Sequence, residues 1–176
     1  RWSYGRSRNE ELKMLAHELF GQAAGNRAYI VSDYRRDVSQ HQGDPSRGQA
    51  VFTKAACITC HQLGDTGVNV GPSLLDVKIK PPEALITDIL DPNRAVEERW
   101  VSWNVATKDD RTLTGLVLAE TTAGITLRLP GGITENISRN EIKKITASGM
   151  SLMPEGLEAA ITPADMADLI AFLKKR

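Results

Sequence analysis

The sequence has no long hydrophobic run and no net charge. No stretch approaches the roughly 20 apolar residues of a membrane-spanning helix, so we expect no membrane span in this chain. Lys plus Arg number 22 and Asp plus Glu number 22. This balance argues against a basic surface made for nucleic acid. The hydrophobic fraction of 41% and the charged fraction of 25% are usual for a globular protein.

Repeats, low-complexity segments and a secretion signal are also missing. The chain begins at Arg1, without the charged and apolar regions of a signal peptide. We therefore expect either a processed protein or a piece of a longer one.

Cysteine is scarce, and the two cysteines lie close together. Cys57 and Cys60 are followed directly by His61, which is the Cys-x-x-Cys-His pattern of c-type haem attachment. The spacing has a geometric reason, because two thiols must reach the two vinyl groups on one edge of the porphyrin while the next residue places an imidazole under the iron. The pattern predicts one haem c, covalently bound through Cys57 and Cys60, with His61 as an iron ligand.

Two other kinds of site use the same residue types. A thioredoxin-like Cys-x-x-Cys needs a βαβ context, which the sequence around residue 57 does not predict. A zinc site needs a second pair of ligands, and the remaining histidines, His17 and His41, do not stand at ligand spacing. We therefore favour haem over both alternatives.

The iron ligand opposite His61 is expected to be a methionine. A thioether raises the reduction potential and fills the coordination sphere, which suits electron transfer. Met14 and Met166 fall in predicted helices, and Met166 lies on an apolar face that we expect to form core. His17 and His41, which would give a bis-histidine iron, are the other candidates.

The two remaining methionines, Met150 and Met153, lie in a predicted loop over residues 149–156. We favour Met153, because Pro154 directly after it would stiffen the loop that holds the sulfur. Ligating histidines usually donate their second ring N–H to a carbonyl or carboxylate. The segment Gly71-Pro72, about eleven residues after the haem motif, is a candidate for that acceptor.

Hydrophobic spacing predicts helices at both ends of the chain. The first covers residues 9–38, where Gly21 and Gly25 would divide it. Short helices follow, one over 47–55 capped by Ser46 and one from 81 to 90. The last helix starts with Thr162 as its cap and Pro163 at its first position.

The middle of the chain alternates as strands do, with tight-turn residues between the segments. The expected strands cover residues 100–107, 112–120, 124–129, 134–138 and 141–146. We expect an antiparallel meander or small barrel over about 99–147, inserted into a helical domain, so the predicted fold is mainly α. The insert has no Gly-rich phosphate loop, no nucleophile elbow and no paired carboxylates.

These residues resemble the class I cytochrome c family. The likeness rests on Gly48 and Phe52, the Cys57–His61 motif, Gly71-Pro72-Ser73-Leu74, Met153-Pro154, and Phe172 in the last helix. The resemblance implies a cytochrome c-type helical haem domain whose first and last helices cross. It also implies that the carbonyl of Pro72 holds the haem-ligating histidine and that Met153 is the distal ligand.

A closer likeness is to the haem-binding domain type described in planctomycetes and verrucomicrobia. It is carried by Arg47-Gly48-x-x-Val51-Phe52, the haem motif, residues 70–74, 89–93, 114–116 and 151–157. This likeness spans residues 44–176 and leaves residues 1–43 as an N-terminal helical extension or linker. It implies a domain that often ends larger chains, some with a dehydrogenase-like part.

The sequence therefore predicts a single-haem electron carrier rather than an enzyme. Covalent haem implies export, so we expect a periplasmic protein. Its expected partners are redox proteins, such as a separate dehydrogenase or one fused upstream. Two alternatives stay open: a haem peroxidase or gas-binding sensor, which needs a vacated sixth site on the iron, and an interaction module that works through the β insert.

Overall fold

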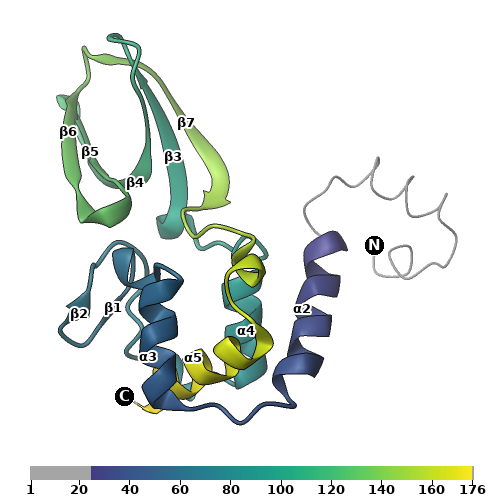
Figure 1. Cartoon of the computed structure of the whole chain (residues 1–176). Coiled ribbons are helices and arrows are strands. Elements are labelled where there is room, and N and C mark those ends of the chain that lie inside the picture. Colours follow the sequence, from purple (N-terminus) through teal and green to yellow (C-terminus); the bar gives the residue numbers. More distant parts are fainter. Residues whose placement is uncertain (1–24, 176) are drawn as a thin grey trace, which may run out of the picture.

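The computed structural model describes residues 25–175, which form a group of helices with a β-sheet at one end (Figure 1). The α-helices are α2 (Gly25–Val38), α3 (Pro45–Lys54), α4 (Pro82–Leu90) and α5 (Pro163–Lys175). The main sheet consists of β3 (Val101–Thr107), β4 (Thr112–Glu120), β5 (Gly124–Arg128), β6 (Thr134–Ser138) and β7 (Ile142–Ser151). A small hairpin pairs β1 (Gln62–Leu63) with β2 (Thr66–Gly67).

The prediction of a mainly α fold is wrong. Of the described residues, 40% are helical and 27% are in strands. The predicted strands are present, but β7 continues to Ser151, beyond the expected end at residue 146. It continues because β3 still offers it a partner there, since Val101 pairs with Ser151. The inserted strands are therefore a substantial second part of the structure.

The sheet is antiparallel throughout, with the strand order β6-β5-β4-β3-β7. Alternate residues point to one face, as the period of a strand requires. They bury a separate apolar cluster of Val105, Ile125, Leu127 and Ile137. The sheet therefore has an apolar core of its own, separate from the helical core.

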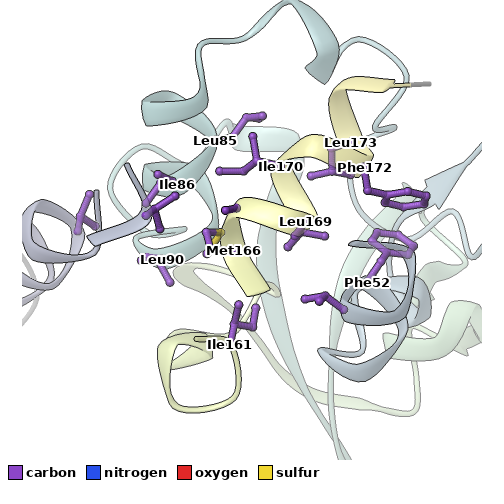
Figure 2. Close-up of a cluster of buried hydrophobic side chains, with 14 of the residues drawn as sticks. Phe52, Leu85, Ile86, Leu90, Ile161, Met166, Leu169, Ile170, Phe172 and Leu173 are labelled. Atoms are coloured by element: carbon purple, nitrogen blue, oxygen red, sulfur yellow. The ribbon is translucent and has the colours of Figure 1, made fainter. Parts of the chain in front are cut away.

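The helical core is centred on the crossing of α3 and α5. Gly48 makes the crossing possible, because a β-carbon there would overlap the backbone oxygen of Asp168. Beside it the rings of Phe52 and Phe172 pack with their centroids 5.9 Å apart (Figure 2). Burying one such side chain contributes about 1.5–3 kcal/mol. The crossing of the first and last helices of the matched region, implied by the resemblance, is confirmed.

Helix α2 also belongs to this core. Val31 and Val38 are buried in the same cluster as Leu90 and Phe52. The predicted helix over residues 9–38 is thus present from Gly25 onward, while residues 9–24, with Met14 and His17, lie outside the described residues.

The helix starts are partly as predicted. Thr162 caps α5, since its Oγ1 accepts the backbone N–H of Asp165 at 3.1 Å. The cap of α3 is Asp44 rather than Ser46, because the Asp44 carboxylate accepts the Ser46 N–H at 2.8 Å.

Within residues 25–175, no helix has both the length and the apolar character needed to cross a bilayer.

Candidate haem site

The Cys-x-x-Cys-His motif forms one tight turn directly after α3. Ala56 adopts a left-handed backbone with a φ of 58°, which turns the chain away from the helix axis. Cys57–Thr59 then form a 3₁₀ turn, and the backbone N–H of His61 donates to the carbonyl of Cys57 at 2.8 Å. Both thiols are free and half-buried. One turn therefore carries all three groups that the motif needs.

The imidazole of His61 is oriented by a backbone carbonyl. Its Nδ1 lies 2.8 Å from the carbonyl oxygen of Pro72. A carbonyl can only accept, so Nδ1 carries the proton, and in a neutral ring Nε2 keeps its lone pair. Burial lowers the pKa of His61, which favours the neutral ring. The structure thus brings His61 and Pro72 together and leaves Nε2 as a metal donor.

The loop after the motif wraps closely around it. The carbonyl of Cys60 accepts the backbone N–H groups of Val70 at 3.0 Å and Gly71 at 2.7 Å. A β-carbon on Gly71 would lie 2.8 Å from Cε1 of His61, and one on Gly67 would overlap the His61 carbonyl. Glycine at these two positions therefore lets the loop lie flat against the motif.

A thioredoxin-like redox pair and a zinc site find little support in this geometry. Burial raises the pKa of the Cys57 thiol, whereas redox-active Cys-x-x-Cys pairs have a lowered thiol pKa. The motif also stands between α3 and the small β1–β2 hairpin rather than in a βαβ unit. In the part of the chain that the structure describes, no three His, Cys, Asp or Glu side chains are grouped to hold a metal ion.

The methionines have distinct environments. Met153 is half-buried in the connection 152–162 between β7 and α5, which we call the methionine loop. Met150 lies within β7, not in a loop as predicted, and 53% of it is exposed. Met166 is fully buried in the helical core (Figure 2), as expected.

His41 is a poor partner for the same iron. It is exposed and precedes the first residue of α3, whereas His61 follows the last residue of that helix. Ten helical residues are about 15 Å long. The two histidines therefore lie at opposite ends of α3.

Two residues that the sequence analysis did not single out hold the methionine loop. Asn93, just after α4, accepts the Ser151 N–H at 2.8 Å through Oδ1 and donates to Glu155 at 2.7 Å through Nδ2. Arg27 on α2 forms a two-pronged ion pair with Glu158. The available signal was the position of Arg27, which shares a helical face with the buried Val31 and Val38.

The β insert touches the loop that follows the haem motif. Arg128 donates to the carbonyl of Asn69 at 2.8 Å. A β-carbon on Gly132 would overlap the side chain of Val68. The turn between β5 and β6 therefore rests on the same loop that orients His61.

The crossed helices, the two free thiols in one turn and the oriented imidazole together define a protein built to carry covalent haem. The residues present fit that group, because Nε2 of His61 is unprotonated and both thiols are unpaired. A sequence model of the cytochrome c family matches residues 45–176, and the chain belongs to the cytochrome c family. No curated protein matched the chain in a sequence comparison.

Membership confirms the predicted resemblance to cytochrome c. It implies a covalently attached haem c, supports electron transfer as the function and implies redox partners. Domains of this family are generally electron carriers and are typically extracytoplasmic.

Proposed function

We propose that this chain carries single electrons through one haem attached to Cys57 and Cys60, with iron held by His61 and Met153. The haem supplies the one-electron redox chemistry when it is bound. The observation that carries the proposal is the hydrogen bond from His61 Nδ1 to Pro72, because it leaves Nε2 as the only ring atom free to bind iron.

Met153 is the proposed second ligand, and its surroundings support this choice. It is half-buried, while Met150 is largely exposed and Met166 is committed to the core. Asn93 holds the chain on both sides of Met153, because it accepts the Ser151 N–H and donates to Glu155. A held thioether keeps the sixth position closed, which favours an electron carrier over a peroxidase or a gas sensor.

We place the protein in the periplasm, since cytochrome c domains are typically extracytoplasmic. We further propose that it belongs to the planctomycete and verrucomicrobium type of haem-binding domain. That likeness favours a dehydrogenase, separate or fused upstream, as the electron donor.

Covalent attachment is tested by mass. The protein is produced in a strain that matures c-type cytochromes, then denatured, reduced and weighed. We expect one haem per chain, and we expect Cys57→Ala and Cys60→Ala each to reduce covalent haem, while His41→Ala leaves it unchanged. A denatured chain that carries no bound tetrapyrrole would overturn the proposal.

The axial ligands are tested by the optical spectrum of the ferric protein. A weak band near the red end marks a methionine–iron bond, and we expect it in the wild type. Met153→Ala should abolish the band, and the matched control Met150→Ala should keep it. A high-spin wild-type spectrum would instead indicate an open sixth site and contradict the assignment of Met153.

A further inference from the structure

Arg27 is an almost buried cation that joins α2, α4 and the methionine loop. Its Nε donates to the carbonyl of Leu90 at 2.8 Å, and Nη2 donates to the same oxygen. The guanidinium also binds both carboxylate oxygens of Glu158, through Nη1 at 2.6 Å and Nη2 at 2.9 Å. The two side chains are only 10% and 22% exposed. Such planar two-pronged pairs are stronger and more directional than a single hydrogen bond.

The position of Glu158 links this contact to Met153. It lies five residues after Met153, in the 3₁₀ turn Leu157–Ala159 of the methionine loop. Leu90 is the last residue of α4. Arg27 therefore ties the loop to the end of α4, on the carboxyl-terminal side of Met153. Asn93 provides a further attachment, at Ser151 and Glu155.

We infer that Arg27 is a positioning residue for the methionine ligand, acting through Glu158. Helix α2 precedes the residues that match the cytochrome c family, so this support comes from outside the matched residues. The inference rests on the proposed ligation by Met153. A contact that is made only while the methionine loop is in place favours iron-bound over released sulfur. The size of this preference is the free energy of the contact.

Arg35, on the same helix, is a matched control. It donates to the carbonyl of Glu83 at 3.1 Å through Nε and at 2.7 Å through Nη2, and it also bonds Thr87. Both acceptors belong to α4. Arg35 therefore joins α2 to α4 as Arg27 does, but among the described residues none of its hydrogen bonds reaches the methionine loop.

The test is a titration of the ferric holoprotein with imidazole, which binds iron only after the methionine has left. Wild type is compared with Arg27→Gln, Glu158→Gln and Arg35→Gln. We expect the first two variants to bind imidazole about fivefold to tenfold more tightly, as the loss of one charge-assisted pair predicts. Arg35→Gln should stay within about twofold of wild type, although both arginine variants should lower the melting temperature.

Glu158→Gln separates the loop contact from general stability, because it leaves the bond between Arg27 and Leu90 in place. If Arg27→Gln does not mature, the imidazole affinities of Glu158→Gln and Arg35→Gln are compared instead. The inference would be overturned if imidazole affinity changed equally in Arg27→Gln and Arg35→Gln. It would also be overturned if the affinity stayed unchanged in both Arg27→Gln and Glu158→Gln. A wild type without the methionine–iron band overturns the proposed ligation itself, so the two failures are distinguishable.

Discussion

The ring of His61 lies directly against the α-carbon of Gly71, where a β-carbon would come within 2.8 Å of Cε1. The next residue, Pro72, offers the carbonyl oxygen 2.8 Å from Nδ1. One short loop thus limits the tilt of the ring by contact and sets its tautomer by a hydrogen bond. Both effects leave Nε2 as the nitrogen available for the iron that we propose His61 binds.

Gly71→Ala should therefore disturb His61, the proposed proximal ligand. The added methyl group forces the ring or the loop to move, and such overpacking costs about 1–3 kcal/mol. We expect a lower free energy of unfolding and less covalent haem per chain, measured by denaturant titration and mass. Asn69→Ala, which removes an exposed side chain from the same loop, is the control. Equal haem content in wild type and Gly71→Ala would contradict the expectation.

The contact between the β insert and the haem-motif loop can be tested with neighbouring glycines. Gly131 and Gly132 both have positive φ values, 80° and 84°, so alanine is strained at either position. Only at Gly132 would the β-carbon meet Val68, whereas nothing lies within 4 Å at Gly131. Gly132→Ala should cost about 1 kcal/mol more than Gly131→Ala, with faster amide exchange at residues 67–71. Identical losses in the two variants would mean that the contact contributes nothing.

The carboxylate of Asp168 makes the free energy of unfolding depend on pH in the acidic range. It accepts the Asp44 N–H at 2.6 Å and the Arg47 guanidinium at 2.7 and 2.8 Å. The hydrogen bonds from Arg47 hold the pKa of Asp168 below its usual 3.8. A lowered folded pKa stabilises the protein above the unfolded value, and this contribution is lost as pH falls through the folded value.

Asp168→Asn should therefore lower the free energy of unfolding by about 2 kcal/mol at pH 7. The difference from wild type should shrink as the pH falls below 3.8, the usual value for this group. Denaturant titrations at several pH values check this, with the exposed Asp76→Asn as control. A difference that stays constant into acid would argue against the ionised carboxylate as its source.

Tyr34 should affect the free energy of unfolding at alkaline pH. Its hydroxyl is buried, and within residues 25–175 no hydrogen-bond partner reaches it. Burial raises the pKa of Tyr34 from 10.0 to about 12, so the unfolded chain ionises first. The contribution of the neutral phenol is full below pH 10 and is lost as the pH rises toward 12.

Tyr34→Phe should remove this residue's share of the alkaline loss and leave stability at pH 7 equal to or above that of wild type. Unfolding titrations between pH 7 and 11 test it, with the partly exposed Tyr29→Phe for comparison. If wild type and Tyr34→Phe lose stability in parallel, the burial of the phenol is not the cause.

Local features were predictable because the chemistry that sets them is local. The haem motif, the Thr162 cap and the turns of the sheet each depend on residues within a few positions of one another. Two expectations were wrong for different reasons. Asp44, only two positions before Ser46, took the cap expected of Ser46. Met150 lies in a strand because β3, distant in sequence, still pairs with the end of β7 at Ser151.

By itself the sequence determined that two thiols and an imidazole occur together in one turn, since five consecutive residues, Cys57–His61, carry them. Only the tertiary structure decided which side chains hold the methionine loop, whereas the carbonyl that meets the ring is that of Pro72, as the family resemblance implied. Arg27 and Glu158 are 131 positions apart, and their pairing follows from how α2, α4 and the loop pack. Contacts at that separation depend on the whole core, and no local pattern encodes them.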